Sequence, residues 1–158
     1  MKTRLLTVVV STLTLLSGCQ LTVPGHLYPV QGPAAAAQSP PAIYSAFATG
    51  RINDGGEMFM GGTLVATLEN NDSCSGNWSP VPAGDNTAGQ MSLQWDQVYG
   101  QGFFLANVLG NSHFARATLT CKSGGPLNLE FFDPNTVHSG NSKGVARDAV
   151  GNLYKVTF

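Results

Sequence analysis

One segment of the chain carries residues whose types and spacing match a hydrolytic site. Gly140, Ser142 and Gly144 form a Gly-x-Ser-x-Gly pattern, and Asp133 and His138 lie shortly before it. In serine hydrolases this pattern makes a strand-to-helix elbow that exposes the serine, and the acid and the histidine follow later in the chain. Here a strand is expected after the pattern, and no histidine follows His138. A hydrolase with a site built from loops is therefore only the alternative function.

The remaining polar residues match no other catalytic, cofactor-binding or metal-binding pattern. The chain has no Walker motif, dinucleotide fingerprint or His-Glu-x-x-His sequence. Carboxylates at turns, loops and helix ends usually cap backbone groups or face solvent, and such positions are expected for Asp72, Asp85, Asp96 and Asp133. His26, His113 and His138 are scattered and are not spaced as metal ligands. We therefore predict no catalytic residues, no cofactor and no metal, and a domain that is not an enzyme.

Two of the three cysteines are candidates for a disulfide. If Cys19 is set aside as a site of lipid attachment, Cys74 and Cys121 remain as an even pair. In an oxidising compartment such a pair most simply forms one disulfide. Cys121 also alternates in step with Leu119, so both side chains should point into the same core. Two separate buried thiols are the rival interpretation.

The N-terminal residues have the layout of a secretory signal peptide. Lys2 and Arg4 precede an uncharged apolar stretch over residues 5–16. This stretch is too short for a transmembrane helix, which needs about 20 apolar residues. The segment predicts export, with residues 1–18 removed.

The end of this stretch, Leu16-Ser17-Gly18-Cys19, resembles the lipobox of bacterial lipoproteins. In that family the peptidase cuts before the cysteine, which then carries palmitate-type acyl chains. The resemblance implies lipidation of Cys19 and attachment to a membrane through the lipid. In Gram-negative lipoproteins an Asp directly after the lipidated cysteine favours retention in the inner membrane. Gln20 occupies that position here, so the resemblance also implies the outer membrane, on either its periplasmic or its surface face. An ordinary secreted protein with Cys19 merely near the cleavage site is the alternative.

The composition also suits an exported β protein. Charged residues make up 11% of the chain, against about 25% in an average soluble domain. The formal net charge of −1 is too small to imply nucleic acid or a polyanion as a partner. Partners in the envelope, whether protein, glycan or lipid, are compatible with this surface.

The chain divides into a spacer and one domain. Residues 19–42 contain five prolines and an alanine run, which predicts a lipidated N-terminus followed by an extended spacer, with a possible edge strand over residues 27–30. Residues 43–158 predict a single β domain, because short alternating segments recur between turn signals. Strands are expected near residues 43–49, 57–69, 73–78, 102–109, 113–121, 127–131, 143–148 and 152–158. Gly61 and Gly62 predict a bulge or bend within the second of these strands.

One helix interrupts the strands. Met91, Trp95, Val98 and Tyr99 are spaced to lie on one helical face, and Gly100 follows as a terminator. The predicted architecture is therefore mainly β, a small antiparallel sandwich or partly closed barrel with one short helix whose Trp95 covers the sheet.

Several motifs resemble those of a group of small proteobacterial lipoproteins that have no known activity. The motifs are Leu27-Tyr28-Pro29-Val30-Gln31-Gly32-Pro33, Cys74-Ser75-Gly76-Asn77-Trp78, Trp95-Asp96 with Val98-Tyr99-Gly100, Gly144-Val145-Ala146, and Gly151-Asn152-Leu153-Tyr154-Lys155. The resemblance implies lipidation and a single domain beginning near Leu27. Together these observations predict a membrane-anchored envelope lipoprotein that acts as a binding or structural module.

Overall fold

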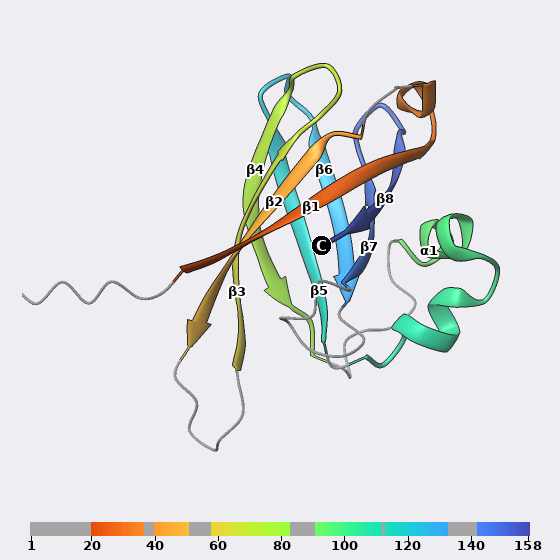
Figure 1. Cartoon of the computed structure of the whole chain (residues 1–158). Helices are drawn as coiled ribbons and strands as arrows, with labels where there is room; N and C mark the ends of the chain where they lie inside the picture. Colours follow the sequence, from red (N-terminus) through yellow and green to blue (C-terminus); the bar gives the residue numbers. More distant parts are fainter. Residues whose placement is uncertain (1–19, 37–39, 51–57, 83–90, 112, 133–141) are drawn as a thin grey trace, which may run out of the picture.

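The computed structural model of the chain describes residues 20–36, 40–50, 58–82, 91–111, 113–132 and 142–158. Within these residues eight antiparallel strands form a closed barrel, in which each strand pairs with its sequence neighbours and the last pairs with the first (Figure 1). The strands are β1 Gln20–Gln31, β2 Ala42–Gly50, β3 Met58–Thr67, β4 Ser73–Pro80, β5 Phe114–Cys121, β6 Pro126–Phe132, β7 Lys143–Arg147 and β8 Leu153–Thr157. The prediction of a mainly β, antiparallel domain with one short helix is confirmed, and the barrel is fully closed.

The barrel interior is filled by one face of each strand. Side chains alternate between the two faces of a strand, and the inward set forms one continuous apolar core: Leu27, Ile43, Leu64, Ala66, Trp78, Ala117, Leu119, Leu127, Leu129, Phe131, Ala146, Tyr154, Val156 and Phe158. Trp78 and Phe158 both meet Phe131 edge to face, with ring centroids 5.6 and 5.4 Å away. Eight strands give a barrel that side chains can fill. The interior is thus a packed core.

The predicted spacer is wrong over most of its length. Residues 20–31 form strand β1, which closes the barrel by pairing with both β2 and β8. Residues Pro33–Ala36 then form a short 3-10 turn, η1, whose Ala34 is buried in the barrel core. Ala34 donates its backbone N–H to Oδ1 of Asn152 at 2.9 Å. The prolines indicated a spacer because proline lacks a donor, yet Pro24 and Pro29 both occupy paired positions of β1.

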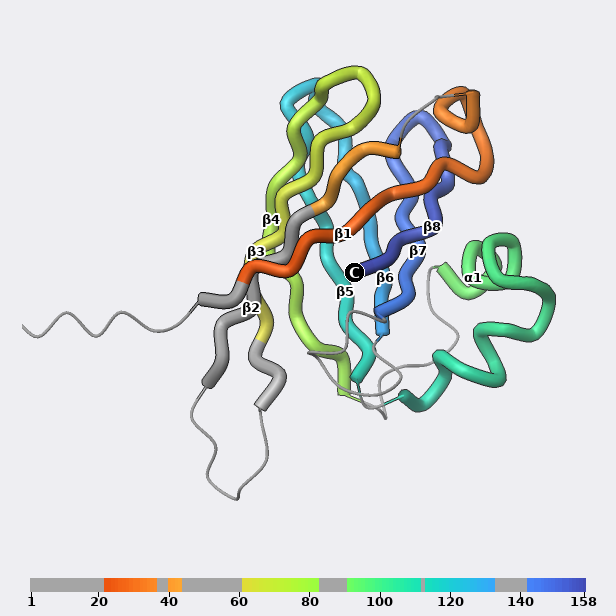
Figure 2. Tube along the Cα trace, viewed as in Figure 1, coloured from red at the N-terminus to blue at the C-terminus, as the bar shows by residue number. Residues whose placement is uncertain are grey.

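The helical excursion between β4 and β5 was predicted only in its first half. Helix α1 spans Ser92–Tyr99, as expected from its apolar spacing. The apolar run after it, predicted as a central strand over residues 102–109, instead forms a π-helical turn, η2, at Phe104–Val108. Helix α1 lies against the outside of the barrel beside β7 and β8, and η2 follows it on the same side (Figure 2). A second apolar cluster fills that contact, and it includes Met91, Trp95, Phe104, Val108, Phe114, Phe132 and Val145.

The predicted bulge is present in the pairing of β2 with β3. Phe47 pairs with Gly62, but Thr49 pairs with Phe59, so the register shifts between them. Gly61 has a φ of +94°, which residues with a Cβ rarely adopt. Gly61 therefore permits the register shift between β2 and β3.

Candidate functional site

Helix α1 is attached to the barrel wall through a buried polar group. Trp95, which is fully buried, donates its indole N–H to Oε2 of Glu130 at 2.9 Å. Arg116 donates from Nε to Oε1 of the same carboxylate, also at 2.9 Å, and forms the ion pair. Glu130 is only 2% exposed, so its charge is balanced inside the contact between α1 and the strands. The Trp95 side chain therefore contributes both apolar packing and a polar link.

The turn between α1 and η2 is held by Asp96. Its carboxylate accepts the backbone N–H groups of Gly102 and Phe104, each at 3.0 Å. The hydrogen bond from Phe104 contributes most, followed by that from Gly102, and together they hold the pKa of Asp96 below its ordinary value. The Trp95-Asp96 motif thus has a structural explanation: one residue attaches the helix, and the next caps the turn that follows.

Tyr99 completes the attachment. Its hydroxyl lies 3.1 Å from the carbonyl oxygen of Gly144 and 3.3 Å from that of Val156, on β7 and β8. A Cβ at Gly144 would lie 2.7 Å from the carbonyl oxygen of Glu130 and 2.9 Å from Cβ of Phe131. Gly144, the last residue of the Gly-x-Ser-x-Gly pattern, therefore serves close packing of backbone against neighbouring strands.

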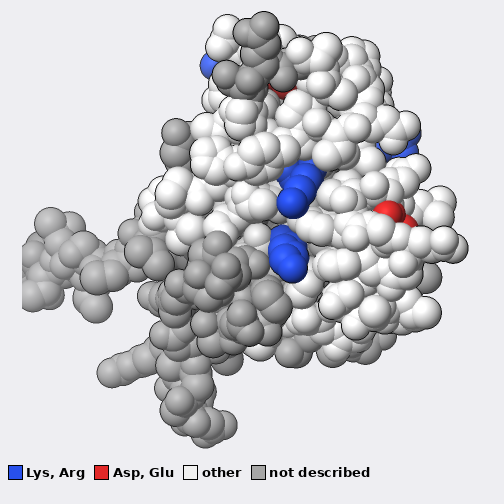
Figure 3. Space-filling model, turned by 45° about the vertical axis from the view of Figure 1, so that its right-hand side comes forward, with Lys and Arg blue, Asp and Glu red and all other residues white. Residues whose placement is uncertain are grey.

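Beside this attachment, β7 and β8 carry a row of basic side chains on the outside of the barrel. Lys143, Val145 and Arg147 alternate outward with the inward Gly144 and Ala146. Figure 3 brings the α1 side of the molecule forward and shows Lys and Arg side chains on a largely uncharged face.

Lys155 extends this row onto β8, because it pairs directly with Val145. We call the set of Lys143, Arg147 and Lys155 the basic face. The cationic groups lie over aromatic rings: Nζ of Lys155 is 5.5 Å from the ring centroid of Tyr99, and Nζ of Lys143 is 5.8 Å from that of Phe103. The Tyr99 and Phe103 rings stack with their centroids 4.7 Å apart. Cations over aromatic rings are held in place without being neutralised.

No acidic residue in the described part of the chain forms an ion pair with the basic face. Glu130 is bound by Arg116 and Trp95, and Asp96 caps the turn before η2. The other described carboxylates lie at the turns that close one end of the barrel: Glu69, Asp72 and Asp148. Among the described residues, the positive charge of the basic face is therefore not neutralised by a carboxylate.

A small polar pocket opens at one end of the basic face. Its volume is about 120 Å³, and it is lined by Gln31, Gln94, Gln97, Arg147, Gly151 and Leu153. These residues come from the end of β1, from α1 and from the hairpin between β7 and β8. Two of the lining amides, Gln31 and Gln97, are exposed, as is Arg147. The pocket thus combines amide groups with a guanidinium.

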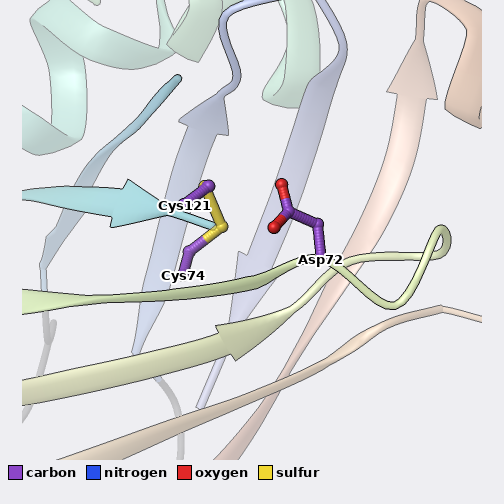
Figure 4. Close-up of side chains that lie close together, drawn as sticks. All are labelled: Asp72, Cys74 and Cys121. Carbon is purple, nitrogen blue, oxygen red and sulfur yellow. A yellow bond between two sulfur atoms is a disulfide. The ribbon is translucent and has the colours of Figure 1, made fainter. Parts of the chain in front are cut away.

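The predicted disulfide pair lies at a different place, at the turn end of the barrel. Cys74 and Cys121 face each other across β4 and β5, with their Sγ atoms 1.98 Å apart in a disulfide. Figure 4 shows the carboxylate of Asp72 beside this disulfide. Ser123 donates both its backbone N–H and its hydroxyl to Asp72. The hydrogen bond from the Ser123 hydroxyl contributes most to holding the pKa of Asp72 below its ordinary value.

The grouping of Asp72, Cys74 and Cys121 has the composition of a metal site but not its chemistry. Their potential ligand atoms all lie within 4.8 Å of one another. A cysteine binds metal as a thiolate, and both sulfurs here are used in the disulfide. Asp72 and the disulfide instead hold together the turns that follow β3 and β5.

A wider hollow of about 220 Å³ lies among these turns, with Asp72, Cys121 and Asp148 in its lining. Tyr154 is fully buried and reaches the same turns, with its hydroxyl 3.2 Å from Oδ2 of Asp148 and 3.4 Å from Oε1 of Glu69. Burial, and then the two carboxylates, raise the pKa of the Tyr154 hydroxyl. Every polar group named here has a partner within the turns, so the arrangement serves to close the barrel end.

The hydrolase pattern does not have the geometry that its chemistry needs. Ser142 is buried, and strand β7 begins at the next residue, whereas a nucleophile elbow leads into a helix. Asp133, His138 and Gly140 lie outside the described residues, as does Cys19.

Sequence reasoning missed the basic face and the polar pocket. Lys143, Arg147 and Lys155 are separated by a turn in the chain and meet only through the pairing of β7 with β8. The alternation of residues 143–147 was the available signal, because it places Lys143 and Arg147 on one face.

Comparison with protein-family models, with curated proteins and with solved structures finds no match for this chain. Within the described residues, no helix has the length and apolar character needed to cross a membrane.

Proposed function

We propose that the protein is a bacterial envelope lipoprotein, anchored to the outer membrane through lipid on Cys19, whose barrel binds an anionic component of the envelope. The basic face is the binding surface. The molecule acts by holding its partner and not by transforming it.

One observation carries this proposal: three cationic side chains stand on one outer face, and none is neutralised by a described carboxylate. Lys143 and Lys155 lie over Phe103 and Tyr99, and Arg147 lies in the same row. An isolated surface charge is common, but a row of one sign raises the local concentration of anions and speeds their encounter. Aromatic rings beneath the cations add contact area for the rest of the ligand.

In this proposal the lipid anchor holds the protein on the membrane and the barrel binds the partner. Two or three acyl chains would hold the protein on a bilayer, since each buried CH₂ contributes about 0.8 kcal/mol. The barrel core is packed with side chains. Recognition would therefore occur on the outside of the barrel.

A pull-down from detergent-solubilised envelopes tests the proposal, with bound proteins, glycans and lipids identified by mass spectrometry. The intact protein is compared with Lys143→Gln/Lys155→Gln and with the matched variant Lys122→Gln, whose lysine follows β5. We expect an anionic component that the intact protein and the Lys122→Gln variant retain and the double variant loses. Equal capture by all three proteins, or no anionic component at all, would contradict the proposal.

The location is tested separately. Replacing Cys19 by Ser should release the protein into the soluble fraction, because the lipid would be absent. Persistent membrane association of that variant would refute the lipid as the sole tether.

A further inference from the structure

The polar pocket between α1 and the β7–β8 hairpin is lined by a residue with a buried oxygen atom that no described residue partners. The side-chain oxygen Oε1 of Gln94 is inaccessible to solvent and accepts no hydrogen bond from any described residue. Buried polar atoms in native proteins are nearly always paired, and an exception calls for an explanation. Gln94 lines the pocket, so a rotation of its side-chain amide toward a ligand there would bring the oxygen to the donor that it lacks.

Arg147 is the second group in the pocket that is available to a ligand. Its side chain is exposed and makes no hydrogen bond or ion pair with the described residues. A guanidinium binds a carboxylate through two parallel N–H···O bonds, which fixes both position and orientation. Arg147 therefore selects for an anionic group at the rim of the pocket.

The three glutamines determine what else the ligand must carry. An amide side chain offers an acceptor oxygen and a donor NH₂ group, and Gln31, Gln94 and Gln97 offer both kinds within one pocket. Hydroxyl groups match such a lining because each hydroxyl donates and accepts. A volume of about 120 Å³ equals that of about four water molecules, so it accommodates one edge of a sugar ring with its carboxylate.

The basic face then accommodates the rest of a chain of such sugars. Leu153 lines the pocket, and Lys155 is the next residue of β8 on the same outer face. Tyr28 pairs with Lys155 from β1 and is 41% exposed, so its ring is available for contact with a sugar face. Lys143 continues the row beyond Lys155.

We propose that this pocket binds a carboxylate-bearing sugar residue of an acidic envelope glycan. Arg147 holds the carboxylate, Gln94 and its neighbouring amides hold ring hydroxyls, and Lys155 and Lys143 hold the next acidic units. This inference rests on the proposed function and names the ligand class for the same face.

Titration of the full chain carrying Cys19→Ser with trigalacturonate tests the pocket, with its methyl ester as the neutral probe and calorimetry as the readout. We expect saturable binding of the acid, weaker binding at higher salt, and at least about tenfold weaker binding of the ester, because the bidentate charge is lost. Arg147→Gln should lower affinity for the acid by about the same factor, and Lys122→Gln should leave it unchanged. No saturable binding, or equal affinity of acid and ester, would overturn the inference.

The Gln94→Met variant distinguishes a role of Gln94 in ligand binding from a purely structural role. The substitution removes the unpaired oxygen while keeping the length of the side chain, so we expect the Tm to rise by about 2–4 °C. Affinity for trigalacturonate should fall at the same time, by about tenfold. A Tm that falls while affinity stays constant would show that Gln94 serves the fold alone.

The two proposals fail in different ways. If the envelope pull-down yields an anionic component that depends on Lys143 and Lys155, but Arg147→Gln and Gln94→Met leave its capture unchanged, only the sugar pocket is refuted. If no anionic component is captured by the intact protein and trigalacturonate does not bind, both are refuted.

Discussion

Trp95 and Glu130 are joined by a 2.9 Å hydrogen bond from the indole N–H to a carboxylate that is 2% exposed. The bond connects the helical excursion to the middle of strand β6, on the outer face of the barrel. Arg116 neutralises the same carboxylate from β5. One buried acid therefore helps to hold the α1–η2 segment on the barrel, together with the apolar cluster and the Tyr99 hydroxyl.

Replacing Glu130 by Ala should lower the free energy of unfolding by about 3 kcal/mol, because Arg116 and the Trp95 indole both lose their buried partner. The cost should lie at the lower end for such pairs, since the Arg116 side chain is 36% exposed and water can solvate it. Urea unfolding measures the change. Glu130→Gln is the matched control, because it keeps an acceptor for Trp95, and it should cost less than the alanine variant. A loss below about 1 kcal/mol for Glu130→Ala would contradict the role given to this carboxylate.

Removing the disulfide should lower the free energy of unfolding by up to about 4 kcal/mol, the chain-entropy value for a bridge between cysteines 47 positions apart. The variant is Cys74→Ala/Cys121→Ala in a Cys19→Ser background, and the measurement is the urea midpoint. The same background without the alanine substitutions should resist thiol labelling when unfolded without reductant. Labelling of both cysteines under that condition would show that the bridge does not form.

Stability should decrease with rising pH above about 10. Burial raises the pKa of the Tyr99 hydroxyl from its ordinary value of 10.0 to about 12. Below pH 10 the hydroxyl is protonated in both states, so its contribution is complete; between pH 10 and 12 the unfolded chain loses the proton first, and the folded state loses its advantage. The pKa of the Tyr154 hydroxyl is also raised, so this residue contributes a loss of the same sign.

Tyr99→Phe should make the pH dependence shallower over this interval, because one of the buried hydroxyls that cause it is gone. Urea midpoints at a series of pH values between 9 and 12 measure the slope. An identical slope in the parent and the variant would show that Tyr99 does not carry this linkage.

Local patterns in the sequence were sufficient where a residue's partner follows from alternation or helical spacing. Leu119 and Cys121 alternate as a strand requires, and both point into the barrel core beside Cys74. Met91 and Trp95 share a helical face, and both lie in the cluster between α1 and the barrel. These features depend only on the period of the strand or the helix.

Features that depend on distant contacts could not be predicted. The apolar run at Phe104–Val108 is short enough for a strand, and it is helical because Asp96 accepts the N–H groups of Gly102 and Phe104 at its start. The segment at Pro33–Ala36 resembles a linker in composition, and it is ordered because Asn152 binds Ala34 from the other end of the chain. The polar pocket combines glutamines from β1 and α1, and no spacing rule connects them.

The closure of the barrel limits how this protein can meet others. Strand β1 pairs with β2 from Gln20 to His26 and with β8 from His26 to Gln31, so most of the described barrel wall is closed. The residues of β1 before His26 have no described partner on the β8 side. Partners that add a strand to an open sheet, and copies that join edge to edge, need an unpaired edge of backbone groups. Along the closed part of the described wall, recognition therefore depends on side chains, whereas the first half of β1 keeps a backbone edge that a partner strand could use.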